Sequence, residues 1–301
     1  MNTEIIRVFP DRNKWTPDDE WAFVGDLPLD SMRPGTPDTP VMISVTFTWW
    51  RRRAEQIAES WRTHYRNVKV GGPAYDDPGA EFIPGMFIKK GCTITTRGCP
   101  KKCGWCSVPK REGALRILPI RPGWIVQDNN LLASSLPSLL YSEIDAREHF
   151  DSVFKMLREQ ERSCSFNGGL DKHFLKEWHV QYFDSIPVAE LWWAADVPDD
   201  FRWLERVREL FSHFPNHKMR CYTMIGYEGE TLAEAEKRIE RVFEMGFMPF
   251  SQLYQPPYAD VPMKVYGADW KAINRKWSRP AIYKAKKAET TENNLFSNAA
   301  I

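Results

Sequence analysis

Apolar residues recur along the chain in two alternating patterns, most regularly after residue 87. Short runs rich in apolar and β-branched residues predict six strands, at 90–96, 124–128, 164–168, 191–196, 219–225 and 247–254. Between the later strands, apolar residues fall at helical spacing over 150–157, 174–178, 204–211 and 232–243. Strands that alternate with helices form parallel sheets with right-handed connections. We therefore expect an α/β fold built from six βα units.

A further unit of the same kind precedes this array. Residues 41–47 predict a strand, a helical face runs from Trp50 to Tyr65, and residues 68–72 predict a second strand. Residues 1–40 are rich in Pro and Asp, so we expect mostly irregular structure there. The expected organisation is an N-terminal extension with one βαβ unit over 1–86, a βα array over 87–255, and a C-terminal extension over 256–301. Within the last part we expect a short helix over 270–277 and a frayed tail over 289–301.

The overall charge of the chain is close to neutral and does not indicate a particular class of partner. The chain has 301 residues, 41 Lys and Arg against 40 Asp and Glu, and a net charge of +1. This balance gives no clear case for nucleic-acid or membrane binding. A local basic run, Lys101, Lys102, Lys110 and Arg111, is either a solvated loop or a rim that attracts anions.

Cysteine usage and the N-terminal residues bear on the compartment. Three of the six cysteines cluster at metal-binding spacing, which favours a reducing compartment over a disulfide scaffold. The N-terminus lacks the basic and then apolar plan of a signal peptide, and no apolar run approaches the length of a membrane span. We expect a soluble, cytoplasmic protein.

The candidate chemistry is concentrated in one loop. Cys99, Cys103 and Cys106 are spaced C-x3-C-x2-C, and Pro100 among them is hostile to a helix. A loop lets three thiolates turn toward one point, and thiolates are the ligands of iron–sulfur clusters. Three protein ligands leave one iron of a 4Fe-4S cluster open to a small molecule, which is a catalytic arrangement.

Two other functions remain open from the same cysteines. Cys92 could complete a four-cysteine zinc site in a zinc-stabilised binding protein. However, Cys92 lies seven residues before Cys99, in sequence that predicts a strand, whereas structural zinc usually takes closely paired cysteines. An iron–sulfur electron-transfer protein is the other alternative.

The cysteine spacing, with Trp105 directly before the last cysteine, resembles the motif of the radical S-adenosylmethionine (radical SAM) superfamily. The flanking stretches 96–100 (Thr-Arg-Gly-Cys-Pro) and 106–109 (Cys-Ser-Val-Pro) are similar to the cluster loop of its methylthiotransferase and cobalamin-binding branches. The resemblance covers about residues 88–255. It implies a partial (βα)6 TIM-like barrel and a 4Fe-4S cluster held by Cys99, Cys103 and Cys106.

The resemblance also implies an activity and its partners. Radical SAM enzymes reductively cleave S-adenosylmethionine to a 5′-deoxyadenosyl radical, which abstracts hydrogen from a substrate. The substrate, a small molecule or modified nucleotide, is not indicated by the sequence, and the catalytic residues are unknown. An external one-electron reductant such as flavodoxin or ferredoxin is expected. The N-terminal unit resembles a truncated Rossmann-like domain, and without an Asp-x-His-x-x-Gly motif it is not expected to bind cobalamin.

Residues at the carboxyl ends of the predicted strands are candidates for binding S-adenosylmethionine, because ligands gather at that edge of parallel βα folds. The expected cofactor-binding residues are Trp105, Asp128, Asn129, Asn130, Gly168, Gly169, Asp196 and Gly226. The superfamily often has Gly-Gly-Glu where this chain has residues 128–130, whose oxygens can accept hydrogen bonds from an ammonium group. Each candidate has a plain alternative as a turn or helix-cap residue. Arg97, Tyr254 and Gln255 are expected to contact substrate.

Overall fold

The computed structural model describes residues 5–77, 81–136, 143–256 and 261–281. The chain packs as two compact units, the first made of residues 1–162 and 256–263 and the second of residues 163–255 and 264–301. The domain boundaries expected from the sequence, after residues 86 and 255, do not coincide with the boundaries of these two units, and they stay a prediction. The tail expected over 289–301 lies outside the described residues.

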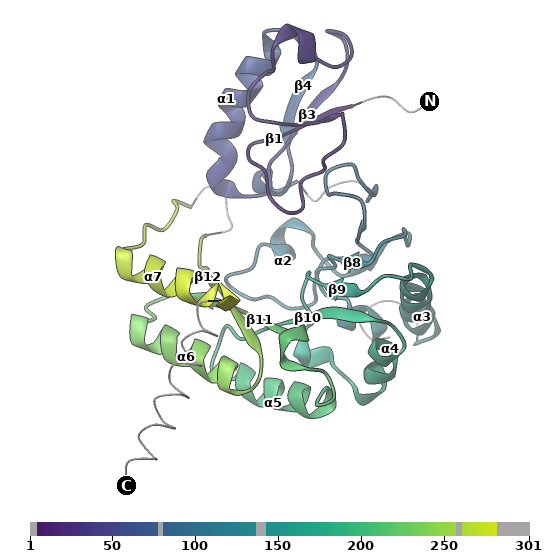
Figure 1. The fold of residues 1–301 in the computed structure, drawn as a ribbon, viewed down its shortest axis with the longest axis vertical. Coiled ribbons are helices and arrows are strands. Elements are labelled where there is room, and N and C mark those ends of the chain that lie inside the picture. Colours follow the sequence, from purple (N-terminus) through teal and green to yellow (C-terminus); the bar gives the residue numbers. More distant parts are fainter. Residues whose placement is uncertain (1–4, 78–80, 137–142, 257–260, 282–301) are drawn as a thin grey trace. The chain divides into compact units, whose positions relative to one another are not determined.

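The first unit begins with a four-stranded parallel sheet. Its strands are β1 (Ile6–Phe9), β2 (Ala22–Val24), β3 (Val41–Ser44) and β4 (Val68–Gly71), in the order β2-β1-β3-β4. Helix α1 (Arg51–Arg62) lies along this sheet (Figure 1) and buries one apolar face against it. The buried side chains shared by sheet and helix include Ile6, Val8, Val41, Ile43, Ala54, Ile57, Ala58 and Trp61.

Two of these strands correct the expectation of a single βαβ unit. β1 and β2 fall within residues 1–40, which are otherwise mostly irregular, as expected. β1 is hidden in the sequence because its second residue, Arg7, is charged yet buried. The Arg7 guanidinium donates to the carbonyl oxygens of Gly85 at 2.7 Å and Met86 at 3.1 Å, and it pairs with Asp19.

The rest of the first unit carries the cysteine loop. β5 (Cys92–Thr93) pairs in parallel with β8 (Ile125–Val126), and β6 (Thr96–Arg97) pairs antiparallel with β7 (Arg116–Ile117). The strand expected over 90–96 is therefore two short strands. α2 (Val108–Arg111) lies between β6 and β7 in sequence, and α3 (Glu143–Glu159) ends this part.

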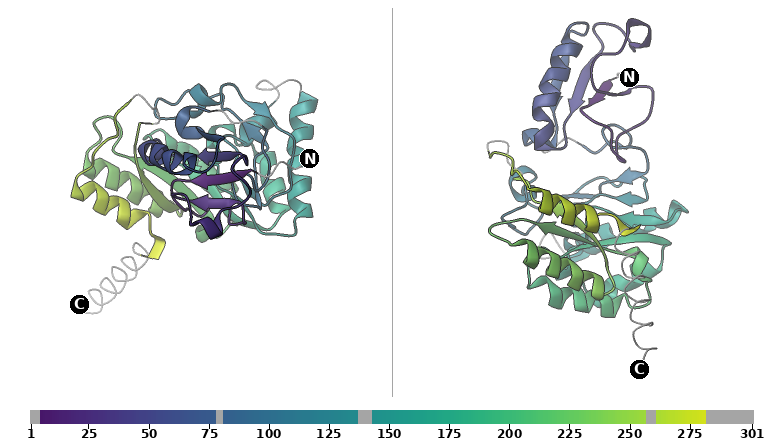
Figure 2. Two further views of the ribbon diagram at one scale, coloured as in Figure 1. Left: turned by 90° about the horizontal axis from the view of Figure 1, so that it is seen from above. Right: turned by 60° about the vertical axis from the view of Figure 1, so that its left-hand side comes forward.

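The second unit is a parallel sheet with helices packed on it. Its strands are β9 (Cys164–Phe166), β10 (Val188–Ala194), β11 (Met219–Ile225) and β12 (Met248–Leu253), in the order β12-β11-β10-β9. Its helices are α4 (Val180–Asp184), α5 (Asp200–Leu210), α6 (Leu232–Glu244) and α7 (Ala268–Trp277). α6 and α7 pack against each other and against β12, and α6 also contacts β11; the two helices lie side by side in Figure 2, in green and yellow. The helix expected over 174–178 is instead a pair of 3₁₀ turns followed by α4.

Short 3₁₀ segments complete the described elements. They are Asp30–Met32, Thr48–Trp50, Pro73–Tyr75, Leu132–Ser135, Lys172–Phe174, Glu177–His179 and Asn216–Lys218. The parallel strands confirm the α/β class. These strand pairings do not establish a barrel, so the partial barrel stays a prediction. In the described part of the chain, no helix is both long and apolar enough to cross a bilayer.

Candidate functional site

The cysteine loop leaves β6 through a position that requires glycine. Gly98 has φ +80°, and a Cβ atom on it would lie 2.2 Å from the carbonyl oxygen of Ala114. The next residue, Cys99, donates its backbone N–H to the Gly113 oxygen at 3.4 Å. From there to Ser107 the chain has no helix or strand, as expected for the segment that carries the cysteines.

Burial divides the six cysteines into two groups of three. Cys99, Cys103 and Cys106 are partly exposed, whereas Cys92, Cys164 and Cys221 are fully buried. Burial raises the pKa of Cys92 and of Cys164 to about 11, and it raises the pKa of Cys221 still further. Because the thiolate is the ligand form, the three buried thiols are poor metal ligands. By protonation state, the partly exposed trio are therefore better candidates for metal ligands than the buried three.

The three thiol groups are not gathered in the structure. Across residues 5–77, 81–136, 143–256 and 261–281, no group of three His, Cys, Asp or Glu side chains lies close enough to hold a metal ion. Trp105, between the last two cysteines, is partly buried. Metal binding couples to local folding, so thiols that lie apart in a metal-free protein can be brought together when a metal binds.

The end of β8 holds the start of the cysteine loop. The Asn129 side-chain oxygen accepts the backbone N–H of Gly98 at 3.0 Å. The Asn130 amide nitrogen donates to the Cys99 sulfur at 3.3 Å, and the Asn130 oxygen accepts the backbone N–H of Ala133 at 3.2 Å. The structure thus brings two of the predicted cofactor-binding residues to the first cysteine.

Asp128 is engaged inside the fold. One carboxylate oxygen accepts the Thr95 backbone N–H at 2.6 Å, and the other accepts the Thr95 hydroxyl at 2.6 Å. The side chain is buried, and burial raises the pKa of this carboxyl to about 6. These bonds tie the end of β8 to the segment between β5 and β6, so the geometry gives Asp128 a positioning role.

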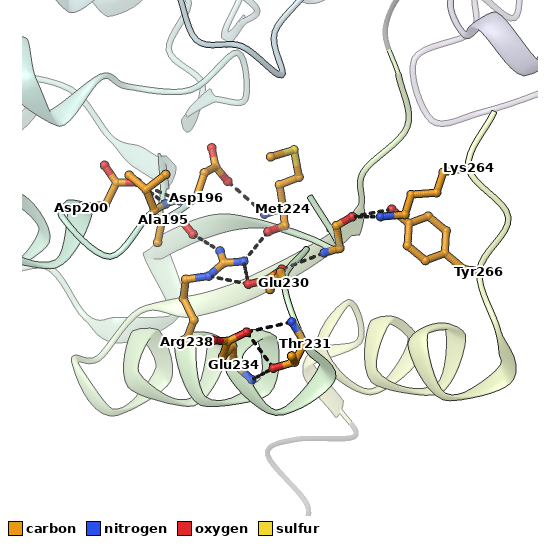
Figure 3. A network of polar contacts seen from close by, with 12 residues as sticks. Ala195, Asp196, Asp200, Met224, Glu230, Thr231, Glu234, Arg238, Lys264 and Tyr266 are labelled. Atoms are coloured by element: carbon orange, nitrogen blue, oxygen red, sulfur yellow. Dashed lines mark hydrogen bonds and ion pairs between the residues drawn. The ribbon is translucent and has the colours of Figure 1, made fainter. Parts of the chain in front are cut away.

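In the second unit, the ends of β10 and β11 are tied together by one buried arginine (Figure 3). Arg238 of α6 donates to the carbonyl oxygens of Ala195 at 2.6 Å and Met224 at 2.7 Å. It also pairs with Glu230, whose second oxygen accepts the Gly226 N–H at 2.8 Å. One side chain therefore fixes the exits of two neighbouring strands.

Asp196 lies beside this network, two residues after the end of β10. Its Oδ1 accepts the Met224 N–H at 3.0 Å, and its own N–H donates to Asp200 at 2.8 Å. Burial raises the pKa of Asp196, and the nearby Asp200 carboxylate adds to that rise. Asp200 is in turn neutralised by Lys172, at 2.7 Å in a buried ion pair.

Gly226 is packed against the C-terminal segment. It has φ +77°, and a Cβ atom there would lie 2.6 Å from the Tyr266 ring. Its carbonyl oxygen accepts Lys264 Nζ and the Tyr266 hydroxyl, the latter at 3.2 Å. Gly226 therefore anchors residues 264–266, which were not expected to take part.

Of the remaining predicted residues, the two glycines adjoin solvent or open space, whereas the expected substrate contacts are bonded within the fold. Gly168 is exposed, and the space around Gly169, where a Cβ atom would point, is open. Among the expected substrate contacts, Arg97 pairs with Glu112, and the Gln255 amide bonds to the backbone of Lys264 at 2.8 and 2.9 Å. The Tyr254 carbonyl accepts the Tyr266 hydroxyl at 2.7 Å.

Arg238, Thr95 and Glu112 were missed by sequence reasoning. Only Arg238 left a signal, because it interrupts the apolar face of a helix between Ala235 and Ile239. No protein-family model matches the chain, and no curated protein matches it in sequence.

Proposed function

We propose that the chain is a radical SAM enzyme in which Cys99, Cys103 and Cys106 hold a 4Fe-4S cluster with one open iron. The observation that carries this proposal is the division of the cysteines by burial. The trio with the C-x3-C-x2-C spacing is the partly exposed one, and its first sulfur accepts a hydrogen bond from Asn130. Hydrogen bonds to cluster sulfurs are a known means of setting the reduction potential.

When bound, the cluster and S-adenosylmethionine together supply reductive cleavage to a 5′-deoxyadenosyl radical, which abstracts hydrogen from a substrate. The residues of the chain position these groups. Asn129 fixes the backbone at Gly98, Asn130 orients the Cys99 sulfur, and Asp128 holds the strand end that carries both. We keep Trp105 as a candidate contact for S-adenosylmethionine.

Four further residues of the chain are kept as candidates for binding S-adenosylmethionine. Gly169 leaves open space for a close backbone approach, and Asp196 presents a partly buried carboxylate at the end of β10. Gly168 and Gly226 complete the proposed set. Gly226 acts through its backbone, since the Tyr266 ring fills the space beside it.

The proposed partners follow from the reaction. The substrate is a small molecule or a modified nucleotide, and the electron comes from an external one-electron reductant such as flavodoxin or ferredoxin. Cys92, Cys164 and Cys221 are buried singly in β5, β9 and β11, so they do not suit a second cluster that could relay electrons.

The test is metal content followed by cofactor cleavage. Anaerobically purified chain should contain about four irons, as a 4Fe-4S cluster requires. Cys99→Ala, Cys103→Ala and Cys106→Ala should each lose the iron, while Cys164→Ala, a matched change at a buried thiol, should keep it. Stoichiometric zinc without iron in oxygen-protected protein would favour the zinc-stabilised alternative and contradict the proposal.

Cofactor cleavage separates an enzyme from an electron carrier. S-adenosylmethionine should perturb the electron paramagnetic resonance spectrum of the reduced cluster, and dithionite should drive release of 5′-deoxyadenosine. A fully loaded cluster that does neither would assign the chain to electron transfer.

A further inference from the structure

The cysteine loop lies in the most basic stretch of the chain. Between residues 97 and 116 there are six basic side chains, namely Arg97, Lys101, Lys102, Lys110, Arg111 and Arg116. Glu112 is the single acidic residue of this stretch, while the whole chain has a net charge of only +1. The positive charge is therefore concentrated where the proposed cluster would bind.

Three of these cations converge on one buried carboxylate. Glu112 Oε1 accepts Arg97 Nη1 and Arg111 Nε, both at 3.1 Å. Arg116 donates to the Glu112 carbonyl oxygen at 2.6 Å and approaches Oε2 at 3.5 Å. These guanidinium groups join β6, α2 and β7 around a side chain that is 1% exposed.

The three arginines around Glu112 carry more positive charge than this one carboxylate neutralises. The Arg97 and Arg111 side chains are only 19% and 15% exposed, and Arg116 is 38% exposed. Arg97 Nε is shielded from solvent and has no hydrogen-bond partner in the described part of the chain. Withdrawing cations from water is costly unless anions compensate them, and one carboxylate serves three guanidiniums. The group formed by Arg97, Arg111 and Arg116 is therefore suited to binding a second anion beside Glu112.

The geometry favours a small phosphate group over a protein surface. Guanidinium groups form paired hydrogen bonds with phosphate oxygens. Each guanidinium has five N–H donors, of which Glu112 takes one from Arg97, one from Arg111 and two from Arg116. Because the Arg97 and Arg111 side chains are mostly withdrawn from water, they suit a compact anion better than an acidic protein, whose binding relies on many exposed charges.

We propose that Arg97, Arg111 and Arg116, organised by Glu112, bind the phosphate group of the substrate. The substrate is then a phosphate-bearing small molecule, such as a nucleotide. Its assignment as the substrate rests on the proposed function, because it depends on Cys99, two residues after Arg97, being a cluster ligand. The anion site itself does not depend on iron or on S-adenosylmethionine.

The test measures binding of inorganic phosphate and pyrophosphate to the full-length chain by calorimetry at constant ionic strength. Arg116→Gln should weaken binding about tenfold, since it removes one charged hydrogen-bonding partner of the anion. Arg97→Gln should do the same. Arg121→Gln is the matched control, because Arg121 lies nearby in sequence but pairs with Glu81 on the surface. Its affinity for phosphate should equal that of the wild type.

Two further measurements distinguish a phosphate site from a site for S-adenosylmethionine or for the iron–sulfur cluster. Arg116→Lys keeps the charge and should retain part of the binding. A single cooperative thermal unfolding transition without phosphate, with a midpoint above the temperature of the binding measurement, would show that each variant is folded. Phosphate binding should persist after cluster loading and at saturating S-adenosylmethionine.

Several results would overturn the anion site or its assignment. Absence of phosphate binding in the wild type, or equal weakening in Arg121→Gln, would remove the site. Competition by S-adenosylmethionine would assign the guanidiniums to that cofactor, and loss of phosphate on cluster loading would make the cluster their compensating anion. Phosphate binding by a chain that takes up no iron would instead disprove the proposed function and leave the anion site standing.

Discussion

Replacing Asp128 by Asn tests the positioning role that the structure gives this carboxyl. The two side chains have the same shape, and the Asn amide can still accept the Thr95 N–H and donate to the Thr95 hydroxyl. The substitution therefore removes a charge and little else. Since burial raises the pKa of Asp128 from 3.8 to about 6, the folded protein disfavours the ionised form.

The size and sign of the effect follow from that pKa. The folded state binds the proton more tightly than the unfolded state, so this contribution to stability is present below about pH 4 and is lost as the pH rises through about 6. A shift from 3.8 to about 6 corresponds to about 3 kcal/mol, at about 1.4 kcal/mol for each pKa unit. The neutral amide of the variant carries no such cost. Relative to the wild type, Asp128→Asn should therefore gain about 3 kcal/mol between pH 4 and pH 7.

Thermal and urea unfolding of both proteins across pH 4 to 7 would measure this difference. For a unit of this size, about 3 kcal/mol corresponds to a relative rise of about 6 to 12 °C in the melting temperature. Asp26→Asn, which removes a carboxylate from the surface ion pair with Arg53, is the control and should show little pH-dependent difference. A constant difference between wild type and Asp128→Asn across this window would refute the reasoning.

Two further predictions concern an ion pair and a glycine near the candidate residues. Arg238→Met should lower the free energy of unfolding by about 3 kcal/mol, because it leaves the mostly buried Glu230 without its cation, and adding Glu230→Gln should restore part of the loss in urea denaturation. Gly98→Ala should cost more than about 3 kcal/mol, because its new methyl group would meet the Ala114 oxygen, whereas Gly113→Ala, at a similar φ with open space, should cost about 1 to 2 kcal/mol. Similar melting temperatures for the two alanine variants would contradict this explanation.

The regular elements were predictable where apolar runs were long. The strand expected over 219–225 is β11 at both ends, because its residues alternate between a buried helix-facing side and a partly exposed side. β1 and β2 were missed because they are three or four residues long and β1 contains Arg7, whose burial depends on acceptors almost 80 residues away. Pattern analysis sees only local spacing, and these partners are distant in sequence.

In the candidate site, too, local features could be predicted from the sequence, whereas contacts between distant residues could not. The loop character of the cysteine segment was evident from Pro100, which lies among the cysteines. The engagement of Asp128 was not, since Thr95 is 33 residues earlier and has no unusual neighbours in sequence. The sequence therefore predicted which strand ends carry polar groups, but not which of those groups are already used within the fold.

The buried position of Cys92 also bears on the choice between zinc and an iron–sulfur cluster. A four-cysteine zinc site needs Cys92 as a thiolate, yet Cys92 lies in β5, paired in register with Ile125 of β8, and is fully buried. Burial raises its pKa from 9.0 to about 11, so forming the thiolate in place costs about 3 kcal/mol more than in water. To reach a metal beside Cys99, Cys92 would also have to leave the strand pair that supports the cysteine loop. Cys99, Cys103 and Cys106 are partly exposed and need no such rearrangement, so the proposed cluster with three thiolate ligands and one open iron requires less change in the fold than a four-cysteine zinc site.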